Sequence, residues 1–193
     1  MGKENLQKYL REMYPMPEEK AVELTGDFTA FSFSKGTFLL EENKVNQRTY
    51  FLESGFVRSF THDSEGNEVT TNIYTAPCFV NDFLSFFKRQ PAKQNFQALT
   101  DCSGWTMTYA DEEIYFNQYP EFREFGRILV LHHFDLLQQR TLELIQESAE
   151  NRYVKLLSEH PEIFQNVSLK IIASYLGITD TSLSRIRKEI CQK

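Results

Sequence analysis

The segment from Ser168 to Lys188 constrains the fold more than any other stretch, because its pattern suits two short helices around a tight turn. Apolar residues recur at helical spacing on both sides of Gly177. Glycine adopts the left-handed conformation that ends a helix without a Cβ clash, and Ala173 is small enough for two helices to cross closely. Thr179 or Asp180 can cap the second helix. The segment therefore predicts a helix-turn-helix.

The second helix of this motif carries hydroxyl and basic side chains on its polar face. Such a helix suits a DNA contact in which its first turn meets base edges while other polar groups meet phosphates. The residues expected toward bases are Thr179, Thr181, Ser182 and Arg185, those expected toward phosphates are Lys170, Ser184 and Lys188, and Asp180 completes the set. The alternative, two packed helices with a solvated outer face, is less favoured by the motif.

The net charge of −6 at first argues against a nucleic-acid partner. The distribution of charge answers this objection, because basic residues outnumber acidic ones after Asn166. They are Lys170, Arg185, Arg187, Lys188 and Lys193, against Asp180 and Glu189. A dimer would present two such basic tails to the phosphates of one duplex.

The first half of the chain changes from a helical to an alternating pattern near Phe28. Residues 3–24 have helical periodicity that Pro15 and Pro17 interrupt. Short alternating segments separated by turn residues follow, at about 30–34, 37–40, 48–52, 56–61, 69–74, 95–100 and 103–109, with a short helix at about 82–87. Strands at such short intervals predict a sandwich or barrel, and the 17 Phe and 9 Tyr fit a β-rich core or a lined pocket.

A long helix is predicted from about Glu121 to Gln146, with Pro120 as a break or a first-turn residue. At 1.5 Å per residue, about 26 residues would span about 39 Å. An approximate heptad seam favours pairing with a second copy of the chain. The expected dimerisation residues are Phe122, Phe125, Leu129, His132 and Leu136. The alternative is that the helix covers the β-rich unit, and both can hold at different ends.

This order of parts resembles the cyclic AMP receptor protein/FNR (Crp/Fnr) superfamily of bacterial transcription regulators. The most specific likeness lies in residues 172–179 and 182–186, with Gly36, Gly55 and Gly66 at β-roll turns. The resemblance implies an α+β fold. It comprises an N-terminal double-stranded β-helix (jelly roll, cyclic-nucleotide-binding-like) in residues 1–110, a long dimerisation helix in 111–147, and a helix-turn-helix, winged-helix-like domain in 148–193. The likeliest hinge lies near Ser148.

Carried over to this sequence, Arg185 matches the family's base- or phosphate-contacting arginine, and Thr179 matches the polar residue that starts the recognition helix. Asp180 and Thr181 fall where the best-known members have an Arg-Glu pair, which predicts a different DNA sequence preference. We also expect the hairpin that follows the recognition helix in other members to be missing. The resemblance makes RNA polymerase a candidate partner beside double-stranded DNA.

Family members that bind cyclic nucleotides carry a Gly-Glu pair and, further on, an Arg-Ser pair. Here Asn81-Asp82 and Ala92-Lys93 stand at these places, and a lysine is a point charge rather than a bidentate fork. We therefore expect no cyclic AMP binding in the usual way and leave room for an unidentified small-molecule effector. The candidate ligand residues are Phe79, Asn81, Asp82, Lys93 and Gln94.

Other chemistry is poorly supported by the sequence. Cys78, Cys102 and Cys191 fit no metal or iron–sulfur spacing and read as reduced cytosolic thiols, with packing favoured over a redox role for Cys78. Catalytic motifs such as HExxH, GxSxG and a phosphate-binding glycine loop are absent, so we expect no enzyme. Neither a membrane-spanning run nor a signal peptide is found, and a cytoplasmic protein is expected. The competing class is a small-molecule or cyclic-nucleotide sensor whose C-terminal helices contact only proteins.

Overall fold

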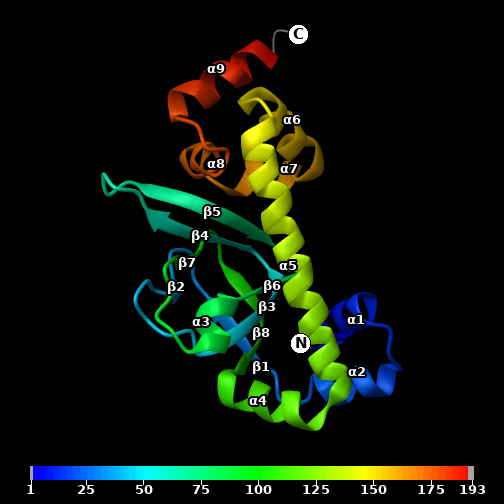
Figure 1. The fold of residues 1–193 in the computed structure, drawn as a ribbon. Coiled ribbons are helices and arrows are strands. Elements are labelled where there is room, and N and C mark those ends of the chain that lie inside the picture. The colour runs from blue at the N-terminus through cyan, green and yellow to red at the C-terminus, as the bar shows by residue number, and fades with distance from the viewer. Residues whose placement is uncertain (1, 191–193) are drawn as a thin grey trace.

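A computed structural model gives the fold and describes residues 2–190, so Cys191 and Lys193 lie outside the described residues. Figure 1 shows a β-roll, a long helix running along its side, and a group of short helices at one end of the molecule. This arrangement follows the order of parts along the chain, with the chain's last described helix at the tip.

The β-roll consists of two four-stranded antiparallel sheets. The first has the order β1-β8-β3-β6, formed by Thr29–Phe33, Cys102–Thr108, Arg48–Ser54 and Cys78–Val80. The second has the order β2-β7-β4-β5, formed by Phe38–Leu40, Asn95–Ala98, Phe56–His62 and Glu68–Thr75. The predicted jelly roll is therefore confirmed, and β6 is the one strand in this region that the sequence pattern did not indicate.

Helices cover the outer face of the first sheet. They include α1 (Glu4–Met13) and α2 (Glu18–Leu24) near the N-terminus, α4 (Tyr109–Gln118) after the roll, and α5 (Pro120–Gln146). Leu6 and Leu10 of α1, four residues apart on one helix face, are fully buried. They share a core cluster with Phe51, Phe79 and other rings outside the roll interior. The short helix α3 (Phe83–Lys88) lies where a helix at 82–87 was predicted.

The long helix α5 begins at Pro120, whose fixed φ and missing N–H suit the first helical position. Phe122, Phe125 and Leu129 are buried in the core cluster of their own chain. These three side chains are thus unavailable to a second chain, which corrects their assignment to the dimer seam. The other two expected seam residues, His132 and Leu136, are exposed. The first half of α5 therefore covers the roll, as the alternative interpretation held.

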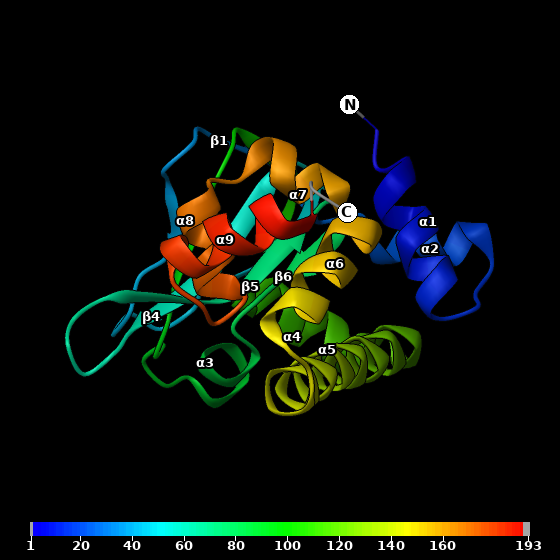
Figure 2. The ribbon, with the colours of Figure 1, turned by 90° about the horizontal axis from the view of Figure 1, so that it is seen from above.

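The C-terminal unit contains α6 (Ala149–Glu159), α7 (Pro161–Asn166), α8 (Leu169–Tyr175) and α9 (Asp180–Ile190). Only Glu147 and Ser148 separate α5 from α6, and the Ser148 hydroxyl caps α6 by accepting from the Asn151 N–H at 3.1 Å. The helix α7 was not predicted. Seen from above, α9 lies outermost, over α8 (Figure 2). Residues 148–190 contain no strand.

Within residues 2–190, no helix is both long enough and apolar enough to span a bilayer.

Candidate nucleic-acid interface

The turn between α8 and α9 is built by local capping. The Gly177 backbone has φ +68°, a left-handed conformation that glycine adopts without strain. The Ile178 N–H returns to the Ala173 carbonyl at 3.0 Å, which ends α8. The Thr179 hydroxyl accepts from the Ser182 N–H at 3.2 Å and so begins α9. Of the two predicted capping residues, Thr179 is thus the one that performs the role.

The helix α9 has one buried face and one polar face. Leu183 and Ile186 are buried against the other helices of the unit. Thr181, Ser184, Arg185 and Lys188, at spacings of three, four and seven residues, lie together on the opposite face, and all four are exposed. Among residues 2–190, neither Arg185 nor Lys188 has a hydrogen-bond or ion-pair partner.

The remaining predicted DNA-facing residues differ in their roles. The Thr179 hydroxyl donates to the Ser182 hydroxyl at 3.0 Å, so both side chains take part in the cap of α9. Asp180 is exposed in the first turn of α9, and Lys170 is exposed near the start of α8. The structure therefore brings seven of the eight residues to α9 and its cap, with Lys170 on the preceding helix.

Two arginines that the sequence analysis did not single out hold the turn in place. Arg140 of α5 lies with its guanidinium 3.7 Å from the Tyr175 ring centroid and donates to the Tyr175 carbonyl. Arg152 of α6 donates to the Leu176 carbonyl at 2.9 Å. These carbonyls lie at the end of α8, where a helix leaves acceptors without intrahelical partners. The helix-turn-helix is thus fastened to both α5 and α6.

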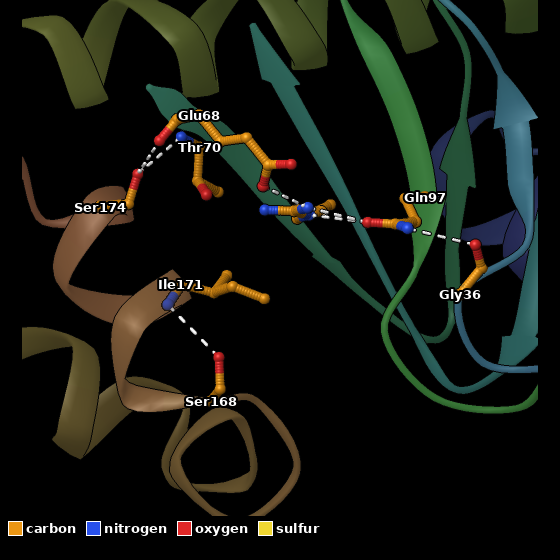
Figure 3. Close-up of polar contacts among 8 residues, drawn as sticks. Gly36, Glu68, Thr70, Gln97, Ser168, Ile171 and Ser174 are labelled. Carbon is orange, nitrogen blue, oxygen red and sulfur yellow. Dashed lines mark hydrogen bonds and ion pairs between the residues drawn. The ribbon is translucent and has the colours of Figure 1, made fainter. Parts of the chain in front are cut away.

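The first helix of the motif docks on the edge strand of the second sheet (Figure 3). The Ser174 hydroxyl of α8 accepts from the Thr70 N–H at 2.8 Å and donates to the Glu68 carbonyl at 3.3 Å. Because β5 is a sheet edge, its backbone groups would otherwise lack a partner on this side. The fastening therefore ties the C-terminal helical unit to the roll of its own chain.

An ion pair between a buried arginine and a half-exposed glutamate lies next to this contact. The Arg58 side chain, only 8% exposed, forms an ion pair with Glu68 at 2.7 Å. It also donates to the Gln97 side chain at 2.8 Å. Breaking such a pair would leave a buried charge uncompensated, which is costly. This pair therefore fixes the strand on which α8 docks.

The predicted ligand residues are not gathered around one cavity. Asn81 is buried and bonded to Asn46 and Thr49, while the Asp82 carboxylate caps α3 by accepting from the Ser85 N–H at 3.0 Å. Lys93 is exposed, and Gln94 accepts from the Thr71 hydroxyl. Phe79 belongs to the cluster outside the roll and not to the cluster inside it.

The roll interior is filled by side chains of the chain itself. Aromatic rings pack there, including Tyr74 against Phe96 at 5.9 Å and Phe31 against Tyr50 at 5.3 Å. The cavity beside Asn81 has a volume of only about 10 Å³, counted as the space that the centre of a water-sized sphere can occupy. Burial raises the pKa of the nearby Cys78 thiol to about 12, so this thiol stays protonated and weakly nucleophilic.

The β-roll region matches a known domain family. Residues 30–119 match the family of the cyclic nucleotide-binding domain. The overall fold is similar to that of solved structures that include a transcriptional regulator of the crp/fnr family.

Particular solved structures share this fold over most of the chain. FixK2 from Bradyrhizobium japonicum is 18% identical with a TM-score of 0.72, over 86% of this chain and 85% of that chain. The c-di-GMP responsive global regulator CLP of Xanthomonas campestris is 16% identical with a TM-score of 0.70, over 89% and 90%. A protein described as a crp/fnr-family transcriptional regulator from Eubacterium rectale is 15% identical with a TM-score of 0.70, over 92% and 87%. Among curated proteins, no relative of similar sequence was found.

Proposed function

We propose that this protein is a homodimeric DNA-binding transcription regulator that places α9 in the major groove. The observation that carries the proposal is the outward face of α9, where Arg185 and Lys188 are exposed and unpaired within residues 2–190. Hydroxyls beside an arginine suit base edges and phosphates together. Two such helices about 34 Å apart would read a palindromic site.

The part of α5 from Leu131 onward supports dimerisation, although by a different face from the predicted seam. Leu131, Phe134, Leu142 and Ile145 are all exposed, and Ile145 is 75% exposed. Spacings of 3, 11 and 14 residues bring them to one side of the helix at 100° per residue. An apolar stripe of this kind on a long helix typically packs against another chain, because leaving it in water is unfavourable. We therefore assign the dimer contact to this stripe.

The effector of this regulator is not cyclic AMP bound in the usual way. Aromatic side chains fill the roll interior, and Asp82 is engaged in capping α3. Lys93 is an exposed point charge that lacks the bidentate geometry of an arginine. Calorimetry with cyclic AMP should give no micromolar binding, and binding at that level would refute this part of the proposal.

The DNA contact is tested by selecting bound duplexes from a random library and measuring mobility shifts with the selected sequence. Binding should weaken steeply with salt, because phosphate contacts release counterions. Arg185→Ala should cost roughly 1–3 kcal/mol on the selected duplex and less on a scrambled one. Arg187→Ala is the matched control, since Arg187 lies two residues further and about 200° around the helix.

Two outcomes would overturn the proposal. A helix-turn-helix that selects no duplex, or binding without salt dependence, would instead favour a sensor whose C-terminal helices contact only proteins. An equal loss for Arg185→Ala on every duplex would make Arg185 a phosphate contact. As a regulator the protein would work beside RNA polymerase, and these partners would place it in the bacterial cytoplasm.

A further inference from the structure

Glu112 of α4 carries a carboxyl group that is buried without a charged partner among residues 2–190. Glu112 is only 8% exposed, and its Oε2 atom has no hydrogen-bond partner within residues 2–190. Burial raises the pKa of this carboxyl to about 7, opposed by a hydrogen bond from the Thr49 side chain. Because buried polar atoms are nearly always paired, an orphaned carboxylate oxygen points to a missing partner.

This carboxyl group lines a cavity between the first sheet and the helices α3, α4 and α5. The cavity has a volume of about 20 Å³, counted as the space that the centre of a water-sized sphere can occupy. One water molecule needs less than this. Apart from Glu112 and Thr49 the lining is apolar. The rings around it are Phe28, Phe79, Phe83, Phe87, Phe122 and Phe125.

The other oxygen of Glu112 already has a fixed partner. Asn46 donates to the Asn81 amide oxygen at 2.6 Å, and Asn81 donates to the Thr49 hydroxyl at 2.5 Å. Because the Thr49 hydroxyl oxygen accepts a hydrogen bond from Asn81, the Thr49 hydroxyl donates its own proton to Glu112. This chain of donors satisfies one carboxyl oxygen and leaves Oε2 for an occupant of the cavity.

Access to the cavity lies at α3. Phe87 is 42% exposed, whereas Phe28, Phe79, Phe122 and Phe125 are almost completely buried. Phe83 and Phe87 stack with their centroids 6.3 Å apart on the same six-residue helix. An occupant larger than water would enter past these two rings.

We propose that this cavity binds a small ammonium cation, either ammonium itself or a short primary or methylated amine. An ammonium group donates hydrogen bonds to the free carboxylate oxygen and is attracted to the faces of the surrounding rings. A purely apolar occupant would leave Oε2 unpaired, and a metal cation would find only the oxygens of Glu112 and Thr49. This proposal can be tested independently of the proposed DNA binding, because occupancy of the cavity is measured on the protein alone.

The experiment uses the thermal unfolding of the full chain, followed by fluorescence of Trp105, the single tryptophan. Trp105 belongs to the core cluster that also contains Phe79 and Phe125, so it reports on this part of the fold. Methylammonium chloride is compared with sodium chloride at equal ionic strength and at pH 8, where the carboxyl is ionised. The unfolding temperature of the wild type should rise with methylammonium concentration, as for any ligand of the folded state.

Three variants separate the site from general salt effects. Glu112→Gln keeps the shape of the side chain and should abolish the rise, while Glu113→Gln, which removes an exposed carboxylate next to it, should retain it. Phe87→Leu should lower the apparent affinity several-fold through the lost ring face. The proposal is wrong if methylammonium raises the unfolding temperatures of the wild type and Glu112→Gln equally, or if potassium raises that of the wild type as much as methylammonium does. It is also wrong if the unfolding temperature of the wild type does not change, because the cavity then holds only water.

Discussion

The pH dependence of stability offers the sharpest test of the buried carboxyl at Glu112. Burial raises its pKa from 4.5 to about 7 in the folded chain. Below pH 4.5 both the folded and unfolded states hold the proton, so the group costs nothing. As the pH rises toward 7, the unfolded state loses its proton first, and the free energy of unfolding falls. Above 7 both states are ionised and the loss is complete.

The size of this loss follows from the same two values. Each pKa unit corresponds to about 1.4 kcal/mol, so the interval from 4.5 to about 7 amounts to about 3 kcal/mol. For a chain of this length, each kcal/mol changes the unfolding temperature by about 2–4 °C, which gives about 6–12 °C. Glu112→Gln lacks the ionisation and should be more stable than the wild type by this amount at pH 8, in buffers free of amines.

Urea unfolding followed by Trp105 fluorescence measures the difference between the two proteins at pH 4.5 and pH 8. The His133 ring, whose pKa burial lowers to about 4, titrates in both proteins and cancels in this difference. Glu113→Gln controls for removing a carboxylate from α4. A stability difference between Glu112→Gln and the wild type that is the same at both pH values would refute the reasoning.

Three further predictions concern the C-terminal half. Phe134→Glu, which puts a charge on the exposed stripe of α5, should yield monomers by light scattering, and an unchanged dimer would exclude this stripe. Ser174→Ala removes both bonds to β5 at about 1 kcal/mol each and should speed hydrogen exchange of the Thr70 amide, whereas unchanged exchange would show the docking to be transient. Gly177→Ala should lower the unfolding temperature of the helix-turn-helix, because a Cβ at φ +68° costs about 1 kcal/mol and would lie 3.2 Å from Leu144; unchanged melting by circular dichroism would contradict this.

Elements with a long or strongly periodic pattern could be predicted from the sequence. The long helix and the two helices of the motif were found because their apolar spacing repeats over several turns. β6 and α7 were missed, although β2 and α3, which have the same three and six residues, were predicted. Length alone therefore does not explain the omission, and the structure of the two missed segments is decided by pairing with β3 and by packing of the C-terminal core.

The errors at the candidate sites have geometric causes. Alternate residues of a strand face opposite sides, so Cys78 and Val80 face the roll interior and Phe79 must face away from it. The dimer seam followed a seven-residue spacing, although a straight helix drifts about 20° per heptad from that spacing.

The burial of Glu112 could have been predicted from the sequence. Asp111, Glu112 and Glu113 are acidic residues that favour the start of a helix, which explains their position but not the burial of Glu112. Glu112 lies three and four residues before Tyr115 and Phe116, and therefore on the apolar face of α4. A charged residue at such a position is rarely buried unless it has a partner, so the pattern marks it as a site.

The helix α5 connects the proposed ammonium site to the proposed DNA-binding unit. Phe122, Phe125 and Leu129 of its first half line the cavity, and Arg140 of its second half holds the end of α8. Over 27 residues it is a single helix of about 40 Å, which is long enough to reach from the cavity to the end of α8. An occupant can alter DNA binding only if it binds two arrangements of α5 with different affinity.

This coupling makes a reciprocal prediction. If methylammonium changes the affinity for the selected duplex by some factor, the duplex must change the affinity for methylammonium by the same factor. Arg140→Ala should reduce that factor toward one while leaving methylammonium binding to the free protein intact, because Arg140 is not among the residues that line the cavity. Mobility shifts with and without the amine, together with amine titrations with and without the duplex, measure both factors. Unequal factors at equilibrium would mean that the two ligands are not acting on one population, and an undiminished factor in Arg140→Ala would exclude this arginine as the link.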